Sequence, residues 1–207
     1  MSKNCPPHKV KNSGCDIYGK QRLELAIHLC EILNNLNINW FIENGTLLGA
    51  YRNNKFIPHD DDFDIAILYQ NNIDDNIKKD MLNIKSKLSR KYDIRLVDTY
   101  TKKLEVFNPS FGKYKLVKEY YNNADFHHVT VDLQAYILKN NKYKSLHSHS
   151  DVRHSFSEIF PFQKIVLENT IFQAPNNVEK ILKNTYGSID ENAKYNSKTG
   201  KYEVIKH

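Results

Sequence analysis

The sequence lacks the long apolar segments of membrane-spanning and secreted proteins. No stretch of its 207 residues approaches the roughly 20 uninterrupted apolar residues that a membrane span needs. The N-terminal segment reads MSKNCPPHKVKNSGCDIYGK and has no apolar region of the kind that a secretory signal carries. The sequence therefore predicts a cytoplasmic protein without a membrane span.

Cysteine is scarce as well. The chain has three cysteines, Cys5, Cys15 and Cys30, an odd number without a C-x-x-C pair, which argues against a disulfide scaffold. Cys30 falls within a predicted helix, where a cysteine acts as a small apolar side chain. A zinc half-site made by Cys5 and Cys15 would need a second half, and none is found in the sequence.

The chain also lacks a concentrated block of positive charge. Its formal net charge is +6 at pH 7, but lysine and arginine are dispersed, with a modest excess between Lys78 and Lys103. This distribution favours a solvated helix face over a nucleic-acid-binding groove, so no nucleic-acid partner is expected. A mildly basic surface would equally suit an anionic small molecule such as a nucleotide.

The length and composition predict one folded domain. Hydrophobic residues make up 40% of the chain and charged residues 26%, which is ordinary for a globular protein with a single core. We expect a loose arm over residues 1–19, a folded domain over residues 20–190 and a polar, irregular tail over residues 191–207. No repeat and no linker divides the chain.

Helix and strand patterns follow one another along this domain. Residues 46–52 are expected to form a helical turn or a tight loop. Apolar residues at helical spacing predict helices over residues 20–36, 74–91 and 176–187. Runs of β-branched and aromatic residues predict strands over residues 38–45, 63–69, 93–100, 103–109 and 127–138, and a hairpin over residues 162–175.

Four aspartates stand within five positions in FIPHDDDFDIAIL, residues 56–68, directly before an apolar run. Residues two apart in a strand point to the same face, so Asp62 and Asp64 share one face, while Phe63 and the alternate apolar residues after it can enter the core. Two carboxylates about 4 Å apart repel by roughly 4 kcal/mol at an effective dielectric constant near 20. The pair therefore splays into water, keeps one proton or holds a divalent cation.

The acidic run also fits two other kinds of structure, a solvated loop and an EF-hand. A solvated acidic loop is the ordinary one, and Asp60 and Asp61 precede the regular strand and are less fixed. An EF-hand would use Asp60, Asp62 and Asp64 as its first three ligands. The EF-hand fails because Ile65 stands where that loop needs glycine, and no glutamate closes the loop.

Asp132 stands alone among apolar and β-branched residues in VTVDLQAY, within a predicted strand. Aspartate is almost never fully buried without a partner. This residue could pair with an arginine or lysine, lie at a solvated edge, or join Asp62 and Asp64 from a neighbouring strand. In the last case, three carboxylates from two strands would suit Mg²⁺, which prefers oxygen ligands.

A small turn precedes the acidic run in NGTLLGAYR, residues 44–52. Gly45 would let the backbone approach a ligand, Thr46 offers a hydroxyl, and Gly49 would relieve crowding. Backbone N–H groups there could hold a phosphate, and Arg52 could add a bidentate contact. Such a turn, a D-x-D strand and a third aspartate on a later strand make up the layout of nucleotidyltransferase-type active sites.

The segment ENGTLLGAYRNNKFIPHDDDFDIAIL closely resembles the core motif of the LicD family, whose usual form is GTLLGA-x-R followed by IPWD-x-D-x-D. Fukutin and fukutin-related protein belong to the same wider group. HHVTVDLQAY resembles the later strand that carries the family's third acid, and FPFQKIVLENTIFQAPNNVEKILKNTYG resembles its C-terminal block. The likeness runs from roughly Lys20 to Gly187.

The resemblance implies an α+β protein with a nucleotidyltransferase (polymerase β-like) fold, in which helices pack against a mixed sheet. It also implies a transferase that moves a phosphorylated alcohol, such as phosphocholine or ribitol phosphate, from a CDP-activated donor to a glycan and releases CMP. Asp62 and Asp64 would be paired ligands of Mg²⁺ or Mn²⁺, and Asp132 would be a third ligand or the base. The donor's phosphates would be bound by Gly45, Thr46, Gly49 and Arg52.

Some alternatives stay open beside this interpretation. The same acids would serve a nucleotidyltransferase that moves a nucleoside monophosphate to a sugar phosphate or another small acceptor. A catalytically inactive nucleotide-binding module would keep the fold alone. His59 stands where the family usually has tryptophan, so it either fills space or changes how the donor packs.

The remaining histidines give no strong signal. His127 and His128 flank the Asp132 strand, and an edge position in water is commoner for such residues than one facing the site. A serine-rich loop with irregular histidine spacing predicts surface or acceptor-loop positions for His147, His149 and His154.

Overall fold

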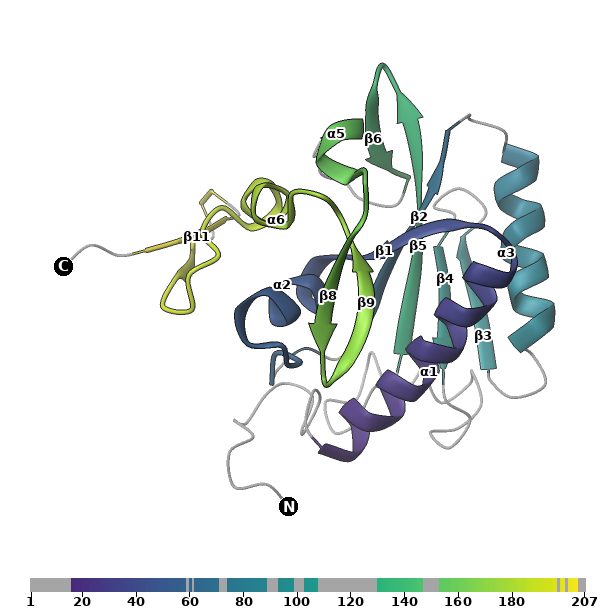
Figure 1. The fold of residues 1–207 in the computed structure, drawn as a ribbon, viewed down its shortest axis with the longest axis horizontal. Helices are drawn as coiled ribbons and strands as arrows, with labels where there is room; N and C mark the ends of the chain where they lie inside the picture. Colours follow the sequence, from purple (N-terminus) through teal and green to yellow (C-terminus); the bar gives the residue numbers. More distant parts are fainter. Residues whose placement is uncertain are drawn as a thin grey trace.

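A mixed seven-stranded β-sheet forms the centre of the computed structural model, and helices cover both of its faces (Figure 1). This architecture agrees with the α+β class that the family resemblance implied. The structure describes residues 16–58, 60, 62–70, 74–88, 93–98, 103–107, 130–146, 153–196, 198–199 and 201–204.

The strands of the central sheet come from widely separated parts of the chain. They are β1 (Asn39–Ile42), β2 (Asp64–Tyr69), β3 (Asp93–Asp98), β4 (Lys103–Phe107), β5 (Thr130–Lys139), β6 (Lys142–Ser145) and β7 (Arg153–Ser155). Their order is β1-β2-β5-β4-β3, with β6 beside β5 and β7 beside β6. β2 and β5 run parallel, and the other neighbouring pairs are antiparallel.

One face of the sheet is covered by α1 (Asp16–Asn35) and α3 (Asp74–Leu88), which contact each other (Figure 1). α1 begins at Asp16, earlier than the predicted start at Lys20, and buries Leu25, Leu29 and Leu33 at helical spacing. The predicted apolar stripe of α3 is also buried, as Ile77, Met81, Ile84 and Leu88. Neither helix, nor any other described one, is both long and apolar enough to cross a membrane.

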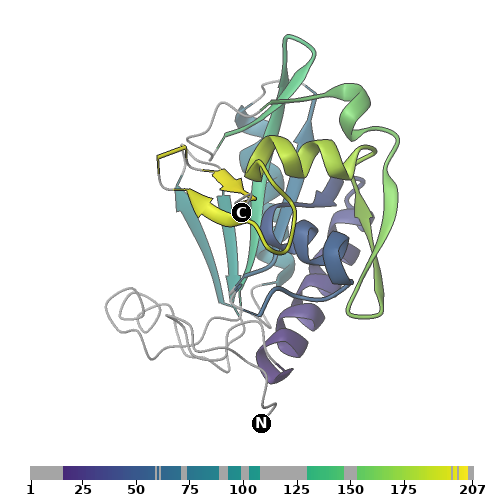
Figure 2. The same cartoon turned by 90° about the vertical axis from the view of Figure 1, so that its left-hand side faces the viewer.

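The opposite face carries α2 (Asn44–Asn53) and α6 (Val178–Tyr186), which pack against each other in front of the sheet in Figure 2. The sequence predicted only a helical turn or tight loop for residues 46–52, and Gly45 and Gly49 lower the helix propensity of this short helix. Leu47, Leu48 and Ala50 are buried, so packing against the rest of the protein stabilises α2. The helix ends at Asn54, which has the left-handed φ of 56°.

The predicted hairpin and the helix that follows it are both confirmed. β8 (Gln163–Leu167) and β9 (Thr170–Ala174) are joined through two residues with positive φ, Glu168 and Asn169, as a tight hairpin turn requires. This hairpin follows a short helix, α5 (Phe156–Ile159). At the start of α6 the Asn177 side chain accepts a 3.0 Å hydrogen bond from the Lys180 N–H, and the helix ends at Gly187.

The C-terminal residues differ from the irregular tail that the sequence predicted. They form a second hairpin, β10 (Lys194–Asn196) and β11 (Lys201–Glu203). The Ser188 N–H donates a 2.8 Å hydrogen bond to the Tyr202 carbonyl, and the rings of Tyr186 and Tyr202 meet edge to face, 6.1 Å apart. Contacts with the end of α6 therefore order a segment whose own sequence carries no strand signal.

Candidate functional site

Three carboxylates meet where β2 and β5 begin. Asp64 and Asp132 are directly paired across the parallel strands, and the Asp132 N–H donates a 2.8 Å hydrogen bond to the Phe63 carbonyl. Asp62 lies two residues before the start of β2. One carboxylate oxygen from each of the three aspartates lies within 4.8 Å of the others. The structure thus brings together the three acids that the sequence singled out.

The strand that presents this cluster is rigidly held. Asp64 and Asp132 are each only 6% exposed, and Asp62 is half-buried. Phe63 and Ile65 point to the other face and are fully buried, as the alternation predicted. The Asp64 N–H donates a 2.9 Å hydrogen bond to the buried Thr46 hydroxyl, which links the site to α2.

The carboxylates of the cluster repel one another. Burial raises the pKa of Asp64 well above its usual value, and the carboxylates of Asp62, Asp132 and Glu43 raise it further. Carboxylate oxygens are the ligands that Mg²⁺ and Mn²⁺ prefer. A divalent cation would relieve this repulsion, so the residues present fit such an ion.

Two glycines of the upstream turn bring α2 close to the chain that leads to the acids. A Cβ on Gly45 would lie 2.3 Å from Asp60 Oδ2, and a Cβ on Gly49 would lie 2.4 Å from the Lys55 carbonyl oxygen. Both distances are far shorter than a van der Waals contact. Both glycines therefore serve the packing of the segment between α2 and Asp62, and their contact with a phosphate stays a prediction.

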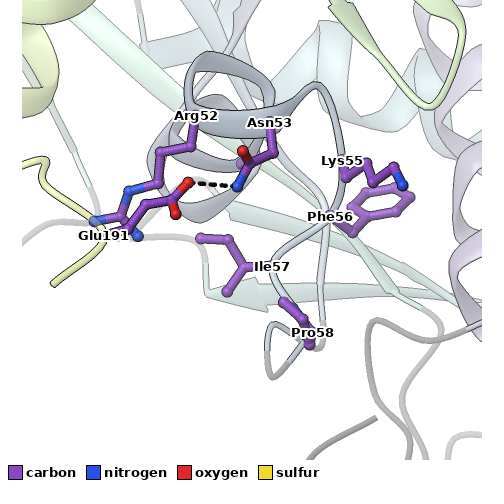
Figure 3. Close-up of a pocket in the computed structure, with 8 residues that line it drawn as sticks. Arg52, Asn53, Lys55, Phe56, Ile57, Pro58 and Glu191 are labelled. Atoms are coloured by element: carbon purple, nitrogen blue, oxygen red, sulfur yellow. Dashed lines mark hydrogen bonds between the residues drawn. The ribbon is translucent and has the colours of Figure 1, made fainter. Parts of the chain in front are cut away.

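Arg52 binds the C-terminal segment. Its Nε donates to the Ile189 carbonyl at 2.9 Å, and its Nη2 donates to the Asp190 carbonyl at 2.8 Å. The same side chain borders a cavity of about 550 Å³ beside Ile57 and Glu191, shown in Figure 3, and none of the three acids lines that cavity. A phosphate contact by Arg52 also stays a prediction, since its guanidinium already has two backbone partners.

Sequence reasoning missed two charged residues near the cluster. Glu43 is 3% exposed and accepts a hydrogen bond from the buried Tyr136 hydroxyl. Arg22 of α1 is fully buried and donates a 3.0 Å hydrogen bond to the Asp60 carbonyl, which anchors the acidic loop. The sequence could have indicated both residues, because each is a charged residue within an apolar pattern. The same feature singled out Asp132.

Of the histidines that the sequence analysis considered, the structure describes His154. The residues His59, His127, His128, His147 and His149 lie outside the part of the chain that the structure describes. His154 is on β7, paired with Tyr143, and is 4% exposed, so the expected surface position is wrong. Pairing with β6 buries it, a long-range contact that a serine-rich sequence does not reveal.

The end of α6 lies on the same side of the sheet as the acids. Burial raises the pKa of the Tyr186 hydroxyl, and the charges of Asp64 and Asp60 raise it further. Tyr186 therefore remains protonated and can donate a hydrogen bond near the cluster. Sequence reasoning assigned Tyr186 no role beyond the Tyr-Gly ending of the C-terminal block.

Two curated relatives share short segments with this chain. Uncharacterized protein RP689 of Rickettsia prowazekii (strain Madrid E) is 51% identical over 60 residues, which are 28% of this chain and 23% of the relative. Uncharacterized protein RT0683 of Rickettsia typhi (strain ATCC VR-144 / Wilmington) is 51% identical over 43 residues, or 21% of this chain and 14% of the relative. The alignments thus span less than a quarter of either relative.

A family model covers much more of the chain. It is described as LicD/FKTN/FKRP, nucleotidyltransferase domain, and it matches residues 37–177. The matched range contains Asp62, Asp64 and Asp132, together with α2. Because the match extends over well more than half of the sequence, this protein belongs to the LicD/FKTN/FKRP family.

Proposed function

We propose that the protein is a divalent-metal-dependent transferase that moves a phosphorylated alcohol from a CDP-activated donor to a glycan and releases CMP. The meeting of Asp62, Asp64 and Asp132 within 4.8 Å is the observation that carries the proposal. Phosphoryl-type transfer asks the protein mainly for positioning and for neutralisation of charge on the phosphates. Acids on adjacent strands of a mixed sheet also support a nucleotidyltransferase (polymerase β-like) fold.

Asp62, Asp64 and Asp132 would hold Mg²⁺ or Mn²⁺ in this reaction. When bound, the cation supplies Lewis-acid stabilisation of the charge that develops on the diphosphate. The chain's own contribution is to fix the three carboxylates before the substrates arrive. Strand pairing and the Thr46 hydroxyl hold Asp64 in place, and residues on rigid elements position a site more accurately than loops do.

The bond changes involve the acceptor, the donor and one carboxylate. An acceptor hydroxyl oxygen bonds to the phosphorus that carries the alcohol, and the bond from that phosphorus to the CMP oxygen breaks. The hydroxyl proton passes to a carboxylate, for which Asp132 is the candidate. Residues of α2 remain candidates for holding the donor's phosphates, namely Gly45, Thr46, Gly49 and Arg52.

Product analysis tests this function. The full chain is incubated with Mg²⁺, a glycan panel, and either CDP-choline or CDP-ribitol, and CMP release and product mass are followed. We expect Asp64→Asn to abolish transfer while the protein stays folded, and Asp80→Asn on α3 to leave transfer unchanged. Normal turnover by Asp64→Asn would refute the assignment.

Two outcomes would replace the proposal. Pyrophosphate release from a nucleoside triphosphate, with transfer of the monophosphate, would identify a nucleotidyltransferase. Absence of metal-dependent binding for every CDP-alcohol would identify an inactive module. Isothermal titration calorimetry with and without Mg²⁺ measures that binding directly.

A further inference from the structure

A row of three carboxylates crosses three neighbouring strands. The antiparallel register of β1 and β2 pairs Ile42 with Ile65, so its continuation by one residue sets Glu43 opposite Asp64. The Glu43 N–H donates a 3.1 Å hydrogen bond to the Asp64 carbonyl, which confirms this placement. Asp64 is in turn paired with Asp132. Directly paired residues share a face of the sheet, so all three side chains project to the same side.

Tyr136 holds the Glu43 carboxylate within this row. It stands four positions after Asp132 on β5 and therefore on the same face. Its hydroxyl donates a hydrogen bond to Glu43 Oε2 in the buried interior. Burial raises the pKa of Tyr136, and Glu43 raises it further, so the phenol remains protonated and keeps donating. The Glu43 side chain thus has a defined orientation beside Asp64.

Local structure does not explain a buried glutamate at this position. Glu43 is the N-cap residue of α2, where a side chain usually accepts a hydrogen bond from the first turn of the helix, but its side chain makes no capping bond. Burying a carboxylate beside Asp64 raises the free energy of the folded chain, since the two charges repel. Glu43 is also outside the group of three whose oxygens lie within 4.8 Å of one another.

We propose that Glu43, oriented by Tyr136, is a positioning residue whose charge strengthens binding of a divalent cation by Asp62, Asp64 and Asp132 without supplying a ligand atom. A fixed negative charge behind the ligands lowers the free energy of the bound cation. Partners that orient or support metal ligands typically contribute about tenfold to a hundredfold in affinity. The inference rests on the cation in the proposed function and is independent of the donor and the acceptor.

Mn²⁺ titration calorimetry on the full chain tests this role with two variants. Glu43→Gln removes the charge but keeps an oxygen that accepts from Tyr136, and it should raise the dissociation constant about tenfold to a hundredfold. Tyr136→Phe keeps the charge but frees its orientation, and it should weaken binding by a smaller factor. Thermal unfolding of the metal-free proteins is measured alongside.

The chain offers a matched pair of control variants. The Tyr69 hydroxyl donates a 3.1 Å hydrogen bond to Asp80 Oδ2, and Tyr69 is at the other end of β2 from Asp64, about 16 Å along the strand. Asp80→Asn and Tyr69→Phe remove the same chemical groups as the two test variants. Both controls should bind Mn²⁺ with the wild-type dissociation constant.

The outcomes separate this role from a structural one and from the proposed function. The role is supported if Glu43→Gln binds Mn²⁺ more weakly while its metal-free form unfolds at or above the temperature of the metal-free wild type. Replacing a purely structural residue would instead lower the unfolding temperature and leave the Mn²⁺ affinity unchanged. Wild-type affinity in Glu43→Gln overturns it. Complete loss of binding, as in Asp64→Asn, also overturns it by making Glu43 a ligand. Absence of Mn²⁺ binding in the wild type itself refutes the cation of the proposed function.

Discussion

The Asp64 N–H donates a 2.9 Å hydrogen bond to the Thr46 hydroxyl, so α2 and the first residue of β2 are joined inside the core. Thr46 is 1% exposed, and its hydroxyl is therefore shielded from water. The family motif places a small hydroxyl residue at the turn, and in this structure that hydroxyl fixes the backbone of a candidate metal ligand.

Replacement of Thr46 by valine keeps the shape of the side chain and removes the acceptor. The Asp64 N–H is then buried without a hydrogen bond, which costs about 1–3 kcal/mol in the free energy of unfolding. Urea denaturation measures the loss. Thr46→Ser restores the acceptor and should recover most of the stability, and equal stability of the valine variant and wild type would contradict the assigned bond.

Gly49→Ala should destabilise the protein although alanine is the better helix former. In an open helix this change would stabilise by about 1 kcal/mol. Here the new Cβ would lie 2.4 Å from the Lys55 carbonyl oxygen, a backbone atom that cannot turn aside, so we expect a net loss of about 1–3 kcal/mol. Denaturant unfolding decides the sign.

Gly45→Ala is the informative comparison for that variant. Its Cβ would meet Asp60 Oδ2 at 2.3 Å, an atom at the end of a side chain that can rotate. The loss of stability should therefore be smaller than for Gly49→Ala. A larger loss at Gly45 would show that the Asp60 side chain is fixed.

Asp64→Asn should raise the unfolding temperature of the metal-free protein at neutral pH. The folded state raises the pKa of Asp64, so this group favours folding below its unfolded-state pKa, and that contribution is lost as pH rises through the folded-state value. Asparagine removes the repulsion between the Asp64 charge and its neighbouring carboxylates.

Differential scanning fluorimetry should also show that Mg²⁺ stabilises the wild type, by about 2.7 kcal/mol at a hundred times its dissociation constant. The same Mg²⁺ concentration should leave the stability of Asp64→Asn unchanged.

His154 should make the protein less stable in mild acid. Burial lowers its pKa from the usual value of 6.5, and the nearby Glu158 only partly opposes this shift. The unfolded chain therefore binds a proton near pH 6.5 while the folded chain resists it, and stability falls as pH decreases from there toward the folded-state pKa. His154→Gln should show a smaller difference in unfolding free energy between pH 7.5 and pH 5.5. An unchanged difference would assign the acid sensitivity to other groups.

The sequence could predict the elements whose signal is local. Asp62, Asp64 and Asp132 stood out because each was an acid at or within an apolar strand, and strand alternation correctly separated them from Phe63. Glu43 carried the same signal but stood at a strand end, where a charged residue is ordinary. The role proposed for Glu43 in cation binding depends on the β1–β2 register, which places Glu43 opposite Asp64. No local sequence pattern specifies that register.

Long-range contacts account for the rest of what sequence reasoning missed. α2 has two glycines and depends on burial of its leucines, while β10 and β11 depend on Tyr186 and Ser188. Arg52 shows the same limit most directly, since its partners Ile189 and Asp190 are 137 and 138 positions away. A sequence motif shows that an arginine stands at this position, but the groups that the arginine binds depend on how distant segments of the chain pack.

Arg52→Lys separates the two roles that remain for this side chain. Lysine keeps the charge but cannot donate from both Nε and Nη2 to the two carbonyls, so residues 187–196 and 201–203 should be held less firmly. We expect faster hydrogen exchange there, including at the Ser188 N–H that bonds to Tyr202, with little change in the exchange of β2 and β5. If Arg52 instead binds the donor's phosphate, the KM for the donor rises while exchange in the C-terminal segment stays at the wild-type rate. Exchange and KM changing together would show that the ordered C-terminal segment itself contributes to donor binding.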